Sequence, residues 1–495
     1  MSSRLALVVL AALSGSVLVR AQPPQRLPNP IEQPATTKGA EAENQLPINL
    51  PTALQLAQVQ PLDIALAGQL LEAAVAQHEK AKSLWLPSLY GGIDYARHDG
   101  QLQDIVGNVF GTSRQSLLFG TGVGAVFSLS DALHAPLAAR QVVDSRRADL
   151  QTATNDMMLA VAEAYFNVQQ ARGEVAGAAD AVARASDLVQ RTEKLTPALA
   201  PALEASRART EHSRRKQALE LAYERWRTAS AELARLLRLQ PGVLVDPIEP
   251  PHLDIQLIDI HQPVDELIPL ALTSRPELAS RQALVQATLR RLKQERQRPL
   301  APSVLIRGNA TNPSGMLSAG SFGGGVGGDM SNFGARHSID VQVVWEFQNL
   351  LSGNRAAAHE RRAENQQAVI ELFRTQDRIA AEVAQAHAQA RAALARMNEA
   401  REAIGHAKDT AEQSLEGLKQ TRRAGELVVL VVRPSEAVAA VQGLAQAYID
   451  FYAAVADHNR AHFRLYRALG KPAQSLQVTV EQPGKPTPFT PPEGR

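Results

Sequence analysis

Residues 61–88 read PLDIALAGQLLEAAVAQHEKAKSLWLPS, and residues 276–303 read PELASRQALVQATLRRLKQERQRPLAPS. Both stretches open with a proline, continue with helix-forming residues and close on Pro-Ser. The two opening prolines are 215 positions apart, and so are the two closing ones. Because proline disfavours helical geometry in the residue before it, each stretch is expected to be a helix that passes into an extended segment. The equal spacing indicates a tandem duplication.

The duplication extends to both sides of these helices. Leu56-Ala57 corresponds to Leu270-Ala271, and the stretch 161–165 (VAEAY) corresponds to 383–387 (VAQAH). Proline-rich stretches flank and separate the two copies. We therefore expect a signal peptide (1–21), a Pro-rich leader (22–46), a first repeat (47–240), a linker (241–263), a second repeat (264–474) and a Pro-rich tail (475–495).

Long helices are expected to dominate each repeat. Aromatic residues make up only 4% of the chain, which is typical of helices packed through small side chains. Apolar residues follow alternating steps of three and four along 219–236 and 379–397, the heptad pattern of coiled coils. The long helices are expected at about 134–194, 202–239, 352–423 and 427–469. The third would be roughly 105 Å long, so the fold should be elongated.

Two strands are expected in each repeat, at about 88–98 and 116–130, and at about 303–311 and 336–348. Apolar and polar side chains alternate most clearly from Ser338 to Phe347, and this period of two is typical of a strand with one apolar face. The glycine-rich run 323–328 lies between two strands. It is expected to be an exposed, flexible loop.

The N-terminus has the features of an export signal. Arg4 precedes an apolar run from Leu5 to Leu18, and Val19-Arg20-Ala21 provides a cleavage site. A spanning helix needs roughly 20 apolar residues. No later stretch is that long, so entry into a bilayer would require a β-barrel. The chain has no cysteine, which excludes disulfides, a catalytic thiol and an acylated N-terminal cysteine.

Charge and motifs argue against several functions. The chain has 52 Lys+Arg and 50 Asp+Glu, so no basic field favours nucleic acid. His458 and His462 have a zinc-binding spacing, but His462 continues an apolar helix seam and no third ligand is close, so no metal is expected.

The run from Gly120 to Gly124 lies in an expected strand, where its glycines would serve curvature rather than bind phosphate. Without a nucleophile-base motif, we expect no enzyme and no cofactor.

The four strands cannot close a barrel within one chain, and an open sheet edge in lipid leaves backbone groups unpaired. Two chains would supply a nearly filled barrel of eight strands, and three chains would supply twelve. A conduit favours three.

Several short motifs, in their order and duplication, resemble those of the outer-membrane efflux proteins, the TolC-like ducts, over nearly the whole mature chain. They are 56–61 and 270–276, the Pro-Ser starts of the strands, Val344-Trp345-Glu346-Phe347 leading to Gly353-Asn354-Arg355, and the closing stretches 236–241 and 469–472. The resemblance implies a mainly α fold with a small β part. Long coiled-coil-like helices in two tandem repeats would form an α-helical barrel across the periplasm, and four strands per chain would join a trimeric 12-stranded transmembrane β-barrel. It also implies a homotrimer in outer-membrane lipid that docks to a periplasmic adaptor (membrane fusion) protein and an inner-membrane transporter.

In that family the turns between the paired long helices form the periplasmic tip, where the channel gates and the adaptor binds. The second tip of this chain contains Arg422, Arg423, Gly425 and Glu426, and it keeps the arginine and glycine of the family pattern. The first tip, Lys194 to Pro201, departs from that pattern because it has two prolines and no glycine. The alternative for both arginines is a solvated helix end, where cations complement the helix dipole.

The leading hypothesis is therefore an outer-membrane channel subunit of a tripartite efflux system, which conducts substrate passively and extends into the periplasm. One alternative is the exit duct of a type I protein secretion system. Another is a soluble periplasmic coiled-coil scaffold.

Overall fold

The computed structural model describes residues 45–59, 61–196, 199–307, 317, 319–327, 329–424 and 427–470. The expected signal peptide, the leader up to residue 44 and the expected tail lie outside these residues. The first half contains β1 (Gln45–Ile48), α2 (Leu50–Val59), α3 (Leu62–Lys82), η1 (Ser83–Trp85), β2 (Ser88–Gln103), β3 (Val109–Ser128), α4 (Leu129–Leu195) and α5 (Ala202–Leu236). After β4 (Leu244–Pro247) follow α6 (Val264–Ser274), α7 (Pro276–Gln297), β5 (Ser303–Arg307), β6 (Ala319–Val326), β7 (Ser331–His337), β8 (Asp340–Val344), α8 (Ser352–Gly417), β9 (Thr421–Ala424), β10 (Leu427–Leu430) and α9 (Pro434–Ala468).

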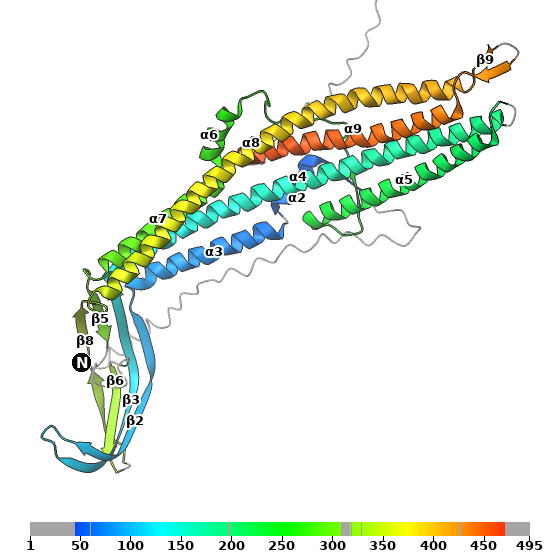
Figure 1. Ribbon diagram of the computed structural model, residues 1–495. Helices are drawn as coiled ribbons and strands as arrows, with labels where there is room; N and C mark the ends of the chain where they lie inside the picture. Colours follow the sequence, from blue (N-terminus) through cyan, green and yellow to red (C-terminus); the bar gives the residue numbers. More distant parts are fainter. Residues whose placement is uncertain are drawn as a thin grey trace, which may run out of the picture.

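The molecule is a long helical array with a sheet at one end (Figure 1). Helices α4 and α8 have 67 and 66 residues, which corresponds to about 100 Å each. Next to the sheet, α4 packs against α3 and α7, and α7 packs against α8. Farther away, α4 packs against α5 and α9, and α9 packs against α8. The pair α4 and α5 from the first half therefore lies beside the pair α8 and α9 from the second half.

The heptad seams are buried as expected. All six seam positions of α8 are buried, from Ile379 to Met397. On α5, the seam residues Ala222, Trp226 and Leu233 are buried, and the indole of Trp226 donates to the carbonyl of Val245 at 2.8 Å. Small alanines at these positions let the helices approach closely. The predicted mainly α fold with a smaller β part is confirmed.

Within the described residues the sheet has four lanes, each made of one strand or of two strands that follow one another end to end. β2 pairs with β3, β3 pairs with both β5 and β6, β6 pairs with β7, and β5 pairs with β8. β5 and β6 therefore follow one another in the third lane, and β7 and β8 follow one another in the fourth. All these pairings are antiparallel.

Several strand boundaries differ from the expected ones. β2 extends to Gln103 and β3 starts at Val109, so the hairpin that they form is longer than predicted. Helix α4 begins at Leu129 rather than near 134. The expected strand 336–348 ends at Val344 and is preceded by β7. The prediction of a flexible loop over 323–328 was wrong for the described residues up to 326, which belong to β6. Glycine is needed here because a Cβ at Gly323 would lie 2.4 Å from the ring of Phe333.

The second turn between long helices was also predicted incorrectly. α8 ends at Gly417 rather than near 423, and α9 begins at Pro434 rather than 427. Between them β9 and β10 form an antiparallel hairpin, with Arg422 opposite Val429. The valine-rich run 428–432 favours a strand over a helix. Pro434 suits the first turn of α9, where a backbone N–H would have no partner within the helix.

The linker between the halves is tied to the long helices. β1 and β4 form a two-stranded parallel sheet, which sequence patterns did not indicate. Tyr165 on α4 donates to the carboxylate of Glu249, and His387 on α8 contacts the carbonyl of Ile260 at 3.0 Å. Tyr165 and His387 are equivalent positions of the duplication. Each half therefore uses the same position to hold a different part of the linker.

Candidate functional site

One face of the sheet is apolar and exposed. Residues directly opposite each other on paired strands share a face of the sheet. Ile93 on β2 lies opposite Phe119 on β3, and Ile306 on β5 lies opposite Val341 on β8. The pairing of β3 with β5 places these two pairs on the same face. The large side chains of this face include Leu89, Ile93, Tyr95, Phe119, Val123, Val341 and Val343. Leu89 is 72% exposed and Phe119 is 62% exposed. Such a contiguous patch is the signature of a membrane or protein contact.

The opposite face carries more polar and small residues. Asp94 pairs with Leu118, Gly120 pairs with Gly320, and Leu305 pairs with Gln342. At Gly120 a Cβ would lie 2.1 Å from the carbonyl oxygen of Ala319. The glycine therefore permits close strand approach, and it belongs to β3 rather than to a phosphate loop.

Both edges of the sheet are open within the described residues. β2 pairs only with β3, and β7 and β8 each pair on one side only. Open edges expose unpaired N–H and C=O groups that can pair with another chain.

The far ends of the helices are held together by contacts between the two halves. Tyr448 on α9 donates to Asp180 on α4 at 3.0 Å, and Arg191 on α4 donates to the carbonyl of Leu415 on α8 at 2.6 Å. Gln442 on α9 donates to Glu211 on α5 at 2.6 Å. We call these three hydrogen bonds the cross-repeat lock.

The lock is part of a packed region rather than a loose surface contact. Burial and the neighbouring Asp180 raise the pKa of Tyr448, so its hydroxyl remains a donor. A Cβ at Gly177 would lie 2.7 Å from Tyr448, and one at Gly173 would lie 2.5 Å from Tyr452. Two glycines one helical turn apart therefore allow these aromatic residues to approach α4. Hydrogen bonds between buried or half-buried groups are expensive to lose without replacement.

The predicted tip residues lie beyond this lock. Arg422 and Arg423 are exposed on β9, and neither has an ion-pair partner among the described residues. Gly425 and Glu426 lie outside the described residues. At the first tip α4 ends at Leu195 and α5 begins after Pro201, and the amide of Leu199 donates to Leu195 at 2.8 Å.

Sequence reasoning missed the lock. Asp180 and Tyr448 are 268 positions apart, and neither belongs to a short motif. The only sequence signal is that Tyr448 lies on a heptad seam, between Ala445 and Tyr452.

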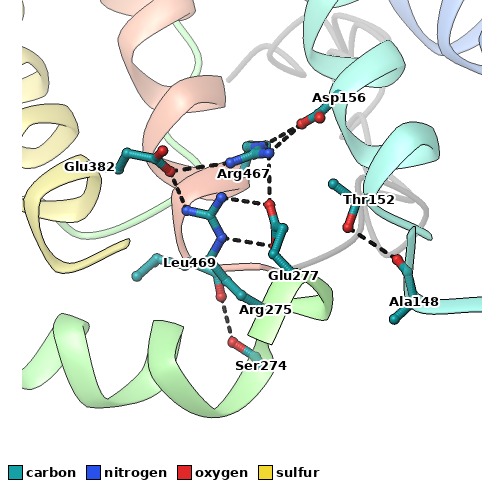
Figure 2. Close-up of polar contacts among 9 residues, drawn as sticks. All are labelled: Ala148, Thr152, Asp156, Ser274, Arg275, Glu277, Glu382, Arg467 and Leu469. Carbon is teal, nitrogen blue, oxygen red and sulfur yellow. Dashed lines mark hydrogen bonds and ion pairs between the residues drawn. The ribbon is translucent and has the colours of Figure 1, made fainter. Parts of the chain in front are cut away.

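A second polar centre joins both halves near the C-terminal end of α9 (Figure 2). Arg275, which is 4% exposed, contacts Glu277 at 2.6 Å and Glu382 at 2.5 Å. Arg467 contacts Asp156 at 2.5 Å and the same Glu277 at 2.8 Å. The cluster therefore connects α4, α7, α8 and α9. Removal of one charged side chain from this cluster would leave its partners without a compensating charge.

His458 and His462 are both fully buried on α9, with ring centroids 4.6 Å apart. Burial lowers the pKa of His458, and it lowers the pKa of His462 to about 4. The Nδ1 atom of His462 accepts from the amide of Leu257 at 3.4 Å, which leaves the proton on Nε2. A metal would need the Nε2 lone pair, so this geometry fits a neutral packed pair better than a metal site.

The part of the chain that the structure describes contains no cluster of three or more His, Cys, Asp or Glu residues that could hold a metal. Its helices include none that is both long and apolar enough to cross a membrane.

Comparisons with known proteins agree with this architecture. A model of the family described as outer membrane efflux protein matches residues 53–237. The fold is similar to the Campylobacter jejuni CmeC outer membrane channel, with a TM-score of 0.67 and 15% identity over 85% of each chain. It is also similar to the outer membrane protein VceC from Vibrio cholerae, with a TM-score of 0.66 and 15% identity over 85% of this chain and 96% of that one.

A third similar structure is the open state of the Neisseria gonorrhoeae MtrE outer membrane channel, with a TM-score of 0.65 and 15% identity over 85% of this chain and 89% of that one. No curated protein sequence matches this chain. The first repeat matches the family by sequence, and the fold extends the likeness to both halves. Residues 53–237 therefore match the outer membrane efflux protein family by sequence, and the chain has the fold of these outer-membrane channels.

Proposed function

We propose that this chain is the outer-membrane channel subunit of a tripartite efflux system and that it conducts substrate passively from the periplasm to the exterior. The observation that carries this proposal is the joining of an exposed apolar sheet face to helices about 100 Å long. The family match and the three channels named above support it. Passive conduction needs no catalytic residue, so we assign none.

We propose a homotrimer because, among the residues that the structure describes, the sheet has two open edges and four lanes. Three copies would supply twelve strands, which is within the range of membrane barrels. The helical array also has apolar outer sides. Leu62, Leu66 and Leu70 are exposed on α3 at one side of the array, and Ile370 and Phe373 are exposed on α8 at the other. Packing of α3 against α8 of the next copy would bury both stripes.

We propose that the cross-repeat lock holds the periplasmic end closed. Its hydrogen bonds join the α4–α5 pair to the α8–α9 pair. Loss of these bonds would let one pair move relative to the other, which is how a ring of helices can widen at its end. Arg422 and Arg423 make no such contact with the described part of the chain, so docking to a partner suits them better than gating.

We propose that a periplasmic adaptor, itself coupled to an inner-membrane transporter, docks along a groove between α8 and α9. Small residues line the groove, including Ala403, Ala407, Ala439 and Gly443, and its volume is 720 Å³. Small side chains permit close approach of another helix. Glu436 and Asp450 at its rim would favour basic side chains on the adaptor.

Export by a signal peptide at 1–21 and insertion in the outer membrane without a lipidated cysteine complete the proposal. Planar-bilayer recording of the purified, detergent-extracted protein tests it. We expect stepwise conductance from a protein that fractionates with the outer membrane. A soluble, non-conducting protein in the periplasmic fraction would overturn the proposal and favour a scaffold.

A further inference from the structure

Helices α5 and α9 end in the same way in the two repeats. Arg238 follows the C-cap of α5 with a φ of 54°, and Gly470 follows the C-cap of α9 with a φ of 76°. These two residues are 232 positions apart. At the same offset, Leu233 on α5 and Leu465 on α9 are both buried, and each accepts a hydrogen bond from the amide four residues later. The two helices can therefore be compared residue by residue.

In the first repeat the chain that leaves α5 becomes β4, which lies on α4 and α5 and pairs with β1. Trp226 on α5 holds this strand, because its indole donates to the carbonyl of Val245 at 2.8 Å. At the offset of 232, the equivalent of Trp226 is His458 and the equivalent of Val245 is Gln477. Gln477 lies outside the described residues.

The ring of His458 is buried without a polar partner. None of its surface is exposed, and neither ring nitrogen bonds to a described residue. A neutral imidazole has one donor and one acceptor nitrogen, and burying them unpaired costs free energy. A partner is therefore expected where Trp226 has one, in the chain that follows the helix.

The linker that packs against α9 also has a free edge. Its alternate amides bond to α9, that of Ile255 to the side chain of Asn459 at 2.9 Å and that of Leu257 to His462 at 3.4 Å. This alternation is typical of an extended strand, so the backbone groups of Gln256 face away from α9. Within the described part of the chain they make no hydrogen bond. Such an edge is a template for another strand.

This part of the linker is the counterpart of β1. Tyr165 on α4 donates to the carbonyl of Ile48, the last residue of β1, at 3.3 Å. Its equivalent His387 contacts the carbonyl of Ile260 at 3.0 Å. Ile260 therefore takes the place of Ile48, and residues 257–260 take the place of β1.

The sequence after α9 has the pattern and the length of a counterpart to β4. Residues 476–480 read LQVTV, in which apolar and polar side chains alternate as in a strand. From His458 to Gly470 the helix covers about 18 Å. An extended chain from Gly470 to Gln477 covers about 23 Å, so it reaches back to His458.

We propose that residues 476–480 of the tail add as a strand to the free edge of the linker, over the buried ring of His458, and form in the second repeat the counterpart of the β1–β4 sheet. The partner of this surface is the chain's own C-terminal segment, because that segment starts at Gly470 on the same helix and has the required length. His458 then has a backbone partner, as Trp226 has in β4. The added strand fastens the linker to α8 and α9, and this inference does not depend on the proposed channel function.

Hydrogen exchange of the full-length, detergent-extracted protein, read by mass spectrometry with residue resolution, tests the proposal. We expect the amide of Gln256 and those of residues 476–480 to exchange at least about tenfold more slowly than those of residues 484–495. Val478→Pro removes a backbone N–H from the added strand and should abolish slow exchange at Gln256. The control Thr487→Pro, later in the tail, should leave it intact. Fast exchange over 476–480 in the natural protein, or slow exchange at Gln256 that survives Val478→Pro, would overturn the proposal.

Cysteine crosslinking shows which copy supplies the strand. The natural chain has no cysteine, and the register of β1 with β4, carried over to the second repeat, places Ser475 opposite Gln256. Opposed residues on paired strands are close enough for a disulfide. The double variant Gln256→Cys, Ser475→Cys should therefore form one within a single chain on mild oxidation, and the control pair Gln256→Cys, Thr487→Cys should not.

Two outcomes of the crosslinking would contradict the proposal. Absence of a disulfide in the intact double variant would overturn the pairing itself. Crosslinked dimers from co-expression of the two single variants, Gln256→Cys and Ser475→Cys, would assign the strand to a neighbouring copy and overturn the arrangement within one chain.

Discussion

Replacement of Tyr448 by phenylalanine should favour the open state of the channel. Tyr448→Phe keeps the ring and removes only the hydroxyl that donates to Asp180 at 3.0 Å. A hydrogen bond to a charged group contributes about 1.5–3 kcal/mol. If the bond exists only in the closed state, its loss shifts the closed-to-open equilibrium by about 10- to 150-fold in each subunit. Single-channel recording in planar bilayers measures this shift as the fraction of time spent open.

Tyr452→Phe is the control for this experiment. Tyr452 stacks on Tyr448 with ring centroids 6.3 Å apart, and within the described part of the chain its hydroxyl has no hydrogen-bond partner. The control should conduct like the natural protein. An equal open fraction for Tyr448→Phe and Tyr452→Phe, with both proteins intact, would refute the role of the Tyr448 bond in closure.

Three further predictions concern buried groups along the helices. The pKa of His462 is about 4 in the fold and about 6.5 in the unfolded chain, so the unfolded chain binds more protons between these values. The free energy of unfolding should be constant above pH 6.5 and fall by about 3 kcal/mol toward pH 4. Urea unfolding at several pH values measures this, and an unchanged dependence of the free energy on pH in His462→Gln would contradict it. Arg275→Met should destabilise the protein by about 3 kcal/mol, because two carboxylates lose a buried partner. Arg401→Met, which breaks an exposed pair, should cost less than about 1 kcal/mol in the same unfolding assay, and equal effects would count against the ion cluster. Gly177→Ala places a Cβ 2.7 Å from Tyr448 and should raise the open fraction through overpacking of about 1–3 kcal/mol; unchanged conductance and stability would show that this contact relaxes freely.

Most of the helical architecture could be predicted from the sequence because the helices repeat two simple patterns. The heptad positions from Ile379 to Met397 are buried as their spacing indicates. The equal separation of the two proline pairs located α3 and α7 and the strands that follow them. These features are local, so side-chain periodicity and proline geometry suffice to reveal them.

The elements that were missed depend on contacts between distant segments. β6 looks like a loop because its glycines have low strand propensity, yet they are required for close approach to β3 and β7. The hairpin of β9 and β10 was hidden by the expectation of a short turn between two helices. β1 and β4 are about 200 residues apart. Their pairing can form only after the helices bring them together.

The functional residues were harder to predict than the fold. Arg422 and Arg423 stood out because they match a family pattern, but they have no ion-pair partners among the described residues. Asp180 and Tyr448 match no motif, and only the packing of α4 against α9 brings them into contact.

Imaging of the detergent-extracted protein by single-particle electron microscopy tests the central claim most directly. The account predicts a threefold particle in which four strands from each of three copies close one ring, with helices that extend about 100 Å from it. A monomer or a twofold particle with the edges of β2 and β8 still unpaired would contradict the account.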